Sequence, residues 1–276
     1  MPSLVVSETV QLVKDKLGPL VSGFANAVLR KISLHADSWR ALPYNLTATS
    51  NETAKWANLP EWIWKKLVTQ KGETWVRNYA ITLLERPELW FREKGEFTLP
   101  QVLKDSKLDE LAGFQDGKIL VQDISNQLLV SEVSQILKKA GKKTVLDLCA
   151  SPGGKSVGLS WNGFQVDAHD RAGHRFEKLE ENLKRLSPEV KTLTAPDLET
   201  KTWDAVWVDA PCTSSGLFRR HPEIRWIRKE EQVQDLGKLQ KELLEKGLSH
   251  LNSGGYLIYS VCSIFKEEGD GLLVSF

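Results

Sequence analysis

The sequence predicts an α/β protein whose C-terminal part, residues 121–276, is a Rossmann-like domain built on a parallel sheet. Two observations lead to this fold class. Short apolar segments alternate with segments of helical periodicity, which is typical of parallel sheets crossed by helices. Glycine-rich, acidic and cysteine-containing stretches follow these apolar segments. The loops at the carboxyl ends of such strands share one crevice, where open α/β sheets bind ligands.

Five apolar segments are expected to form the strands, and they cover residues 144–148, 165–169, 190–194, 204–208 and 256–261. Between the second and third segments, four apolar residues recur at steps of three and four, namely Phe176, Leu179, Leu183 and Leu186. This spacing predicts a helix with a buried apolar stripe. After Gly271, the last apolar residues predict one more short strand.

Two smaller regions are expected before this domain. Residues 1–58 show helical periodicity, and Pro19 divides them into two helices. The polar stretch 45–53 is a candidate linker. Residues 59–120 mix helical and extended patterns, with Pro87 and Pro100 as breaks, and they predict a small α/β module.

The composition predicts a cytoplasmic protein, which we expect to be a monomer. No segment approaches the roughly 20 consecutive apolar residues of a membrane span, so no membrane partner is expected. The formal net charge is +1, so a nucleic-acid site must be a local basic patch. Candidates are the lysines at 138, 139, 142 and 143 and the stretch 219–229, although either could be a solvated charged face. Three cysteines without paired spacing predict reduced thiols and no metal site.

A candidate nucleotide site follows the first strand of the predicted sheet, where the chain reads Cys149-Ala150-Ser151-Pro152-Gly153-Gly154-Lys155-Ser156. Small residues and two glycines let a ligand approach the backbone closely. The segment from Gly154 to Ser156 also matches the end of a P-loop, which would indicate an NTPase. That motif needs a glycine where Cys149 stands, and Pro152 lies inside the loop, so the NTPase alternative is disfavoured.

Acidic residues follow three successive strands of the predicted sheet, at Asp170, Asp197 and Asp209. A carboxylate in the position of Asp170 can accept both ribose hydroxyls of an adenosine. Any single aspartate of this kind could instead cap the helix that follows it. Three of them at one sheet edge, beside a glycine-rich loop, favour a ligand site.

Two cysteines are expected at the same sheet edge, because Cys212 follows the fourth strand and Cys262 follows the fifth. A buried cysteine is usually an inert small apolar residue, and this is the interpretation that we favour for Cys149 behind the glycine loop. Two thiols at neighbouring strand ends instead indicate a reactive role for these cysteines.

Three segments carry a resemblance to a known family: "DLCASPGGKS", "DAPCTSSGLFRRHPEIRW" and "YSVCS". In sequence, order and spacing they resemble the Fmu/Sun group of RNA cytosine-5 methyltransferases, and "RRHPEIRW" resembles its bacterial 16S ribosomal RNA branch. The earlier segments "GFANAVLRKI", "LPEWIWKKL" and "GKILVQDIS" resemble other parts of the same group. The resemblance implies a truncated NusB-like RNA-binding domain at 1–58, a linker module at 59–120 and a methyltransferase domain at 121–276.

The resemblance also implies roles for individual residues. S-adenosylmethionine would be the cofactor, and the residues implied to bind it are Cys149, Ala150, Ser151, Pro152, Gly153, Gly154, Lys155, Asp170, Asp197 and Asp209. Cys262 would attack the target cytosine of ribosomal RNA, Asp209 would lie near the methyl-transfer centre, and Cys212 would assist product release. DNA cytosine methyltransferases instead use the cysteine of the "PC" motif as nucleophile. Three residues after the catalytic loop are expected to grip the RNA: Arg219, Arg220 and His221.

Some segments depart from the family's pattern. The N-terminal helical domain is shorter, the segment "WFREK" lacks an asparagine that the family has, and the stretch from Gly269 to Gly271 stands where the family has another helix. These departures leave an alternative open, in which the protein is a noncatalytic RNA-binding factor of ribosome assembly that keeps the methyltransferase fold.

Overall fold

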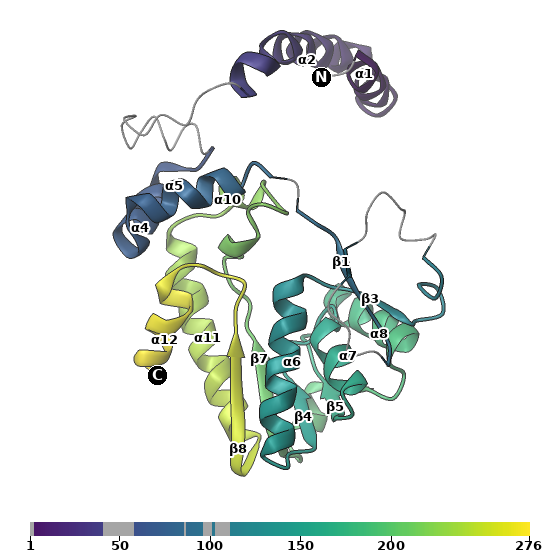
Figure 1. The fold of residues 1–276 in the computed structure, drawn as a ribbon, viewed down its shortest axis with the longest axis vertical. Helices are drawn as coiled ribbons and strands as arrows, with labels where there is room; N and C mark the ends of the chain where they lie inside the picture. Colours follow the sequence, from purple (N-terminus) through teal and green to yellow (C-terminus); the bar gives the residue numbers. More distant parts are fainter. Residues whose placement is uncertain (1–2, 41–57, 86, 96–100, 103–110) are drawn as a thin grey trace. The chain divides into compact units, whose positions relative to one another are not determined.

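The chain forms two compact units, Met1–Asn58 and Leu59–Phe276, which are drawn in Figure 1. The structure is a computed structural model that describes residues 3–40, 58–85, 87–95, 101–102 and 111–276. The candidate linker at 45–53 lies outside these residues. No helix in the described ranges is both long and apolar enough to cross a membrane.

The first unit contains the two helices predicted from the periodicity, α1 (Ser3–Leu17) and α2 (Pro19–Arg40). Pro19 is the first residue of α2, a position where its missing N–H costs no helical hydrogen bond. Val6 of α1 and Ser22 of α2 are buried.

The second unit begins with two helices, α4 (Glu61–Lys71) and α5 (Glu73–Thr82). They bury Ile63, Leu67 and Val76, each fully. A three-stranded antiparallel sheet follows, in which β1 (Trp90–Glu93) pairs with both β2 (Gln101–Val102) and β3 (Ile119–Val121).

The centre of the second unit is a five-stranded parallel sheet with the strand order β6-β5-β4-β7-β8. Its strands are β4 (Thr144–Asp147), β5 (Gln165–Ala168), β6 (Lys191–Thr192), β7 (Trp203–Asp209) and β8 (Leu251–Ser260). The predicted α/β fold class, with a parallel sheet after an N-terminal helical region, is therefore confirmed.

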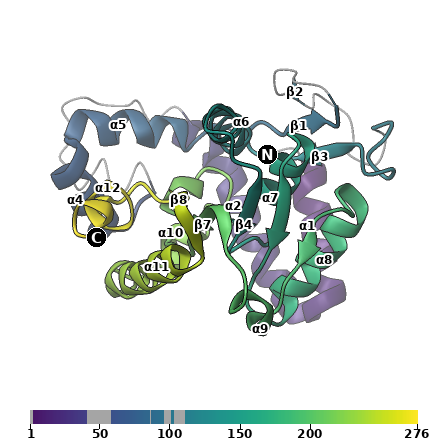
Figure 2. The ribbon, with the colours of Figure 1, turned by 90° about the horizontal axis from the view of Figure 1, so that it is seen from below.

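Helices cover both faces of this sheet (Figure 2). The helices α6 (Ile124–Lys139), α7 (Gly154–Trp161) and α8 (His174–Leu186) contribute to one core cluster, and α11 (Glu231–Ser249) packs on β7 and β8. As predicted, α8 buries Leu179, Leu183 and Leu186. Two short helices, α9 (Ala195–Leu198) and α10 (Ile224–Ile227), lie in the connections before and after β7.

Two sequence-based expectations differ from the structure. Strand β8 begins at Leu251, five residues before the predicted start, because the pairing with β7 shifts register between Trp203 and Ala205 and so absorbs the polar stretch before Tyr256. The predicted terminal strand was wrong. Residues Asp270–Val274 form the short helix α12, which follows the 3-10 turn η3 (Lys266–Glu268) and buries Leu272.

The strand order places a topological switch point between β4 and β7. The chain moves from β4 outward to β5 and β6, and then returns to the other side of β4 to build β7 and β8. At such a point the loops diverge and leave a crevice at the carboxyl ends of the strands. The loops after β4, β7 and β8 therefore converge on one site.

Candidate active site

A cavity of about 610 Å³ opens at the switch point, a volume in the usual range for small-molecule sites. It is lined by residues from the start of α6 and from the loops after β4, β7 and β8. These include Gln122, Asp123, Asn126, Asp147, Cys149, Ala150, Ser151, Pro152, Gly154, Lys155, Asp209, Ser260 and Cys262. Almost all of the predicted cofactor loop lies on this wall.

The loop after β4 is shaped by its glycines. Gly153 has φ 102°, in the left-handed region that favours glycine, and a Cβ there would lie 3.1 Å from Leu179. At Gly154 a Cβ would lie 2.9 Å from Nε2 of Gln122. These two positions bring the loop backbone close to α8 and to the start of α6, and they leave the cavity side open for a ligand.

A buried aspartate lies at the base of the cavity. Asp147, the last residue of β4, is fully buried, and its Oδ2 accepts a hydrogen bond of 2.6 Å from Ser156 Oγ. Its Oδ1 has no hydrogen-bond partner among the described residues. Burial raises the pKa of Asp147 to about 7. Asp147 thus lines the cavity and holds one buried carboxyl oxygen that makes no hydrogen bond among the described residues.

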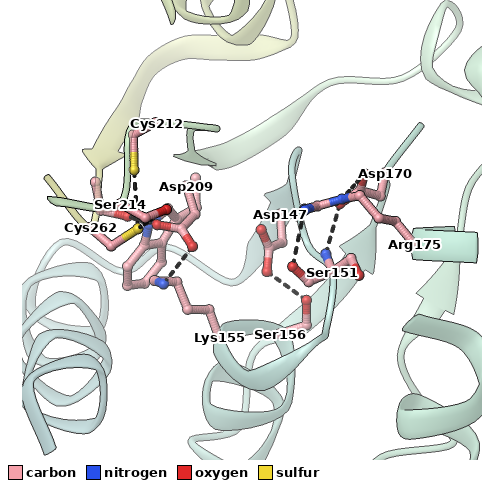
Figure 3. A network of polar contacts seen from close by, with 12 residues as sticks. Asp147, Ser151, Lys155, Ser156, Asp170, Arg175, Asp209, Cys212, Ser214 and Cys262 are labelled. Carbon is pink, nitrogen blue, oxygen red and sulfur yellow. Dashed lines mark hydrogen bonds and ion pairs between the residues drawn. The ribbon is translucent and has the colours of Figure 1, made fainter. Parts of the chain in front are cut away.

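Asp170 lies directly after β5 and its side chain is 6% exposed. Its Oδ2 accepts a hydrogen bond from the Ser151 N–H at 2.9 Å, and its Oδ1 accepts one from the Arg171 N–H at 2.9 Å. The guanidinium of Arg175 pairs with the same carboxylate at 3.1 Å (Figure 3). Asp170 therefore braces the loop after β4, and Arg175 occupies part of its hydrogen-bonding capacity.

Asp209 ends β7 and faces the loop after β4. Lys155 Nζ lies 2.7 Å from Asp209 Oδ2, and Ser260 Oγ donates to Asp209 Oδ1 at 2.6 Å. The side chain of Lys155 is 10% exposed and that of Asp209 is 34% exposed. The ion pair joins the start of α7 to the end of β7 (Figure 3), and the Ser260 hydrogen bond joins the end of β7 to the end of β8.

The two thiols lie next to each other at the edge of the cavity. The Sγ atoms of Cys212 and Cys262 are 3.1 Å apart, although the residues are 50 positions apart in the chain (Figure 3). Cys212 is buried and Cys262 is exposed. Ser214, whose Oγ lies 3.4 Å from the Sγ of Cys262, has φ 60°, an uncommon backbone conformation for a residue with a side chain.

This arrangement makes the two thiols chemically unequal. The hydrogen bond with Cys212 lowers the pKa of Cys262, because it stabilises the Cys262 thiolate, while burial acts in the opposite direction. The same hydrogen bond and burial raise the pKa of Cys212. Cys262 is therefore the more nucleophilic thiol, and Cys212 stays protonated. The third thiol, Cys149, is inert because burial raises its pKa to about 12.

The sequence profile of the family described as 16S rRNA methyltransferase RsmB/F matches residues 134–275, more than half of the chain. The chain belongs to this family. The resemblance to the Fmu/Sun group is thereby confirmed. Ribosomal RNA small subunit methyltransferase B from Cronobacter sakazakii is 29% identical over 310 residues, which cover 100% of this chain and 69% of that relative.

Two solved structures have a similar fold. The crystal structure of PH0851 superposes with a TM-score of 0.77 at 25% identity and covers 97% of this chain and 66% of that chain. The crystal structure of NSun6 from Pyrococcus horikoshii with SFG superposes with a TM-score of 0.52 at 27% identity, covering 62% of this chain and 44% of that chain.

Some predicted site residues are not among those that line the main cavity, namely Gly153, Asp170, Asp197, Cys212, Arg219, Arg220 and His221. Asp197 caps α9, because its carboxylate accepts hydrogen bonds from the Thr194 N–H at 2.8 Å and the Thr194 hydroxyl at 2.6 Å. Asp197 is the third residue of α9 and forms a capping box with the N-cap Thr194, so the expectation that it directly follows a strand was wrong, because β6 ends at Thr192. The Asp197 side chain is exposed, and its place beside the adenine stays a prediction.

Two of the predicted RNA-binding residues line a second, smaller cavity of about 250 Å³, which shares Asp123, Gly216 and Leu217 with the main one. Arg219 and Arg220 both line it. Arg220 pairs with Asp123 at 3.1 Å and donates to the Glu88 carbonyl at 3.0 Å, whereas the exposed His221 lies 3.3 Å from the Glu223 carboxylate. Arg220 thus already has a partner within the protein.

The arginines of the basic stretch 219–229 do not all face solvent, as a surface patch would require. Arg225 is 4% exposed and donates to the Phe218 carbonyl at 3.0 Å, and Arg228 donates to the Thr213 carbonyl at 3.1 Å. These two arginines support the loop after β7. No group of three or more His, Cys, Asp or Glu side chains that could hold a metal ion occurs in the described part of the chain.

Several site residues had no motif to identify them. Gln122, Asp123 and Asn126 come from the start of α6, and only the fold brings them to the cavity. The sequence shows that Asp147 ends a predicted strand, but it does not show that one of its carboxyl oxygens has no hydrogen-bond partner among the described residues. A clue lay in the segment "GKILVQDIS", in which Asp123 is the N-cap of α6.

Proposed function

We propose that the protein methylates carbon 5 of a cytosine in RNA, with 16S ribosomal RNA as the substrate and S-adenosylmethionine as the methyl donor. The observation that carries the proposal is the pair of thiols, 3.1 Å apart, at the edge of the cavity that the cofactor loop lines. Family membership in the 16S rRNA methyltransferases supports the RNA substrate.

The cavity fits a nucleoside cofactor. The glycine-shaped loop from Cys149 to Lys155 leaves a backbone wall facing the cavity, and Asp147 adds a buried carboxyl oxygen that makes no hydrogen bond among the described residues. Asp170 would accept hydrogen bonds from the ribose hydroxyls, and part of its present pairing with Arg175 would then be lost. The bound cofactor would supply an electrophilic methyl group. NSun6, a solved relative, was crystallised with SFG, an analogue of S-adenosylmethionine.

Cys262 would act as the nucleophile. Carbon 5 of cytosine is a weak nucleophile, and addition of a thiolate at carbon 6 makes the ring an enamine that reacts at carbon 5. The exposed Cys262, with its lowered pKa, is suited to this addition. Once carbon 5 has taken the methyl group, a base such as water would accept the carbon-5 proton, the electron pair of that C–H bond would restore the ring double bond, and the bond to Cys262 would break to release its thiolate.

Cys212 would assist that last step. Its protonated thiol can donate a hydrogen bond to the departing Cys262 thiolate, and this makes Cys262 a better leaving group. The Asp209 carboxylate, which is held by Lys155 and Ser260, would face the polar edge of the cytosine. The target base must leave its stack to reach the cavity, which favours single-stranded or loop RNA.

The direct test is methyl transfer from labelled S-adenosylmethionine to 16S ribosomal RNA, followed by mapping of 5-methylcytosine. We expect label in one or a few cytosines of the RNA, and none with the Cys262→Ala variant. RNA binding without any methyl transfer would contradict the proposal and would support the noncatalytic assembly factor.

A further inference from the structure

A buried carboxylate lies behind the two thiols. Glu268 is the last residue of η3, six positions after Cys262, and its relative exposure is 0%. In the sequence it belongs to the run Lys266-Glu267-Glu268-Gly269-Asp270, which is typical of a solvated surface. A fully buried glutamate is uncommon unless its charge is compensated, so this position calls for a physical reason.

Both carboxylate oxygens of Glu268 are used to join the two cysteine loops. Oε1 accepts the Thr213 N–H at 2.8 Å, and Oε2 accepts the hydroxyl of Ser263 at 2.6 Å and that of Thr213. Thr213 directly follows Cys212, and Ser263 directly follows Cys262. One side chain thus holds the residue next to each thiol.

The surroundings of Glu268 are neutral. Gln240 of α11 adds a fourth donor at 3.2 Å, and the Tyr259 hydroxyl donates to the Glu268 backbone carbonyl at 2.7 Å. Among the described residues, no lysine, arginine or histidine forms an ion pair with this carboxylate. The negative charge is compensated by oriented dipoles, and these require Thr213 and Ser263 to stay in place.

Besides Glu268, one weaker contact joins the loops beside the thiols, where the Thr213 hydroxyl lies 3.3 Å from the Ser263 hydroxyl, and the other contacts lie farther from Cys212. The Gly216 N–H donates to the Cys262 carbonyl at 2.9 Å, and a Cβ at Gly216 would lie 3.0 Å from that oxygen. The Ile264 N–H donates to Ser215 Oγ at 2.9 Å. Between these contacts and Cys212 lies Ser214 in its left-handed conformation. Arg228 and Gln240 also hold this turn, because they donate to the carbonyls of Thr213 at 3.1 Å and Pro211 at 2.9 Å, but neither of them lies on the Cys262 loop. Glu268 is the side chain that ties the turn to the Cys262 loop beside the thiols.

We infer that Glu268 is a positioning residue, which fixes the Sγ of Cys212 against the Sγ of Cys262 by holding Thr213 and Ser263. The inference rests on the proposed function, because that function gives the thiol pair its role. Without Glu268 the loops would remain, but the two thiols would lose their shared hydrogen bond for part of the time. The charge of Glu268 also helps to raise the pKa of Cys212, after the larger effects of the Cys262 hydrogen bond and burial.

The test measures the thiol geometry directly, on the full chain and without RNA. Diamide, an azo oxidant, takes two electrons and two protons from a pair of adjacent thiols, which become a disulfide while diamide is reduced to a hydrazine. Peptide mapping by mass spectrometry gives the rate at which the Cys212–Cys262 disulfide forms. We compare Glu268→Ala and the isosteric Glu268→Gln with Glu267→Gln, a matched control whose carboxylate is 41% exposed and contacts Lys66.

Glu268→Ala should slow disulfide formation by about tenfold, because hydrogen bonds to a charged group are lost on both loops. Glu268→Gln should slow it less, since an amide can still bond both hydroxyls, and Glu267→Gln should match the wild type. In methylation assays Glu268→Gln should lower kcat and leave the KM for S-adenosylmethionine unchanged. If Glu268→Ala does not fold, Ser263→Ala replaces it, with a smaller slowing expected.

Wild-type disulfide rates in folded Glu268→Ala and Glu268→Gln would overturn the positioning role. The experiments also distinguish failure of the positioning role from failure of the proposed function. If the wild type methylates no RNA while the Glu268 variants still slow the disulfide, the proposed function fails and the positioning role stands. Equal slowing by Glu267→Gln would mean that a general loosening of this segment, and not the loss of the Glu268 hydrogen bonds, moves the two thiols apart.

Discussion

Replacing Cys212 by alanine should make Cys262 a less reactive thiol at neutral pH. The Cys212 S–H lies 3.1 Å from the Cys262 sulfur and is the largest influence that lowers the pKa of Cys262. Hydrogen bonds to charged groups contribute about 1.5–3 kcal/mol, and a thiol is a weak donor. We therefore take the lower end, about 1.5 kcal/mol, which corresponds to about one pKa unit.

Loss of the Cys212 donor should raise the pKa of Cys262, because that donor lowers it in the wild type. A lowered pKa means that the Cys262 thiolate is populated at lower pH than in an ordinary cysteine. Without the donor, the inflection of reactivity moves up by about one pH unit. At pH values below both inflections the rate falls about tenfold, and at alkaline pH the two proteins converge. Ser214, Asp209 and Lys155 also face Cys262, and they are the same in both proteins.

The measurement is the rate of iodoacetamide alkylation of Cys262 as a function of pH, followed by mass spectrometry. Cys262→Ala gives the background of the other thiols. Cys212→Ser is the matched control, since its hydroxyl can still donate, and its inflection should stay near that of the wild type. An unchanged pH profile in Cys212→Ala would refute the hydrogen-bond explanation for the unequal thiols.

Two further predictions concern the cofactor and the RNA. Asp170→Ala should weaken S-adenosylmethionine binding at least about tenfold by calorimetry, because a ribose acceptor and the brace on Ser151 are both lost; unchanged cofactor affinity in the folded variant would contradict the ribose role of Asp170. Arg219→Ala should raise the KM for RNA and reduce its salt dependence, and Arg220→Ala should also lower the thermal stability, since it breaks the pair with Asp123; an unaltered salt slope in both variants would make these arginines purely structural.

Much of the sheet and the cofactor loop could be predicted because their signals are local. The run Val145–Leu148 is apolar apart from Asp147 and leads directly into small residues and glycines, and β4 begins and ends close to the predicted bounds. The prediction of a terminal strand was wrong because such local signals are missing there. Apolar residues without flanking signals do not distinguish a strand from a short helix, and Leu272 is buried in a helix instead.

The parts of the site that could not be predicted depend on contacts between distant residues. Glu268 looks like a surface residue in the sequence, and its burial follows only when Thr213, 55 positions away, reaches it. Arg225 belongs to a basic stretch, but its guanidinium bonds the carbonyls of its own loop. Charge and spacing cannot show which members of a basic run turn inward.

The division of labour between the thiols is the central claim, and it is tested most directly by looking for a covalent protein–RNA adduct. Wild type, Cys212→Ala and Cys262→Ala are each incubated at pH 8.5 with 16S ribosomal RNA and S-adenosylmethionine, and then separated by denaturing electrophoresis. Removing Cys212 takes away the donor that helps Cys262 leave, so Cys212→Ala should accumulate a slow-migrating, nuclease-sensitive band. Cys262→Ala should form no such band and transfer no methyl groups. An adduct that persists in Cys262→Ala and is absent from Cys212→Ala would place the nucleophile on the loop after β7 and contradict the account.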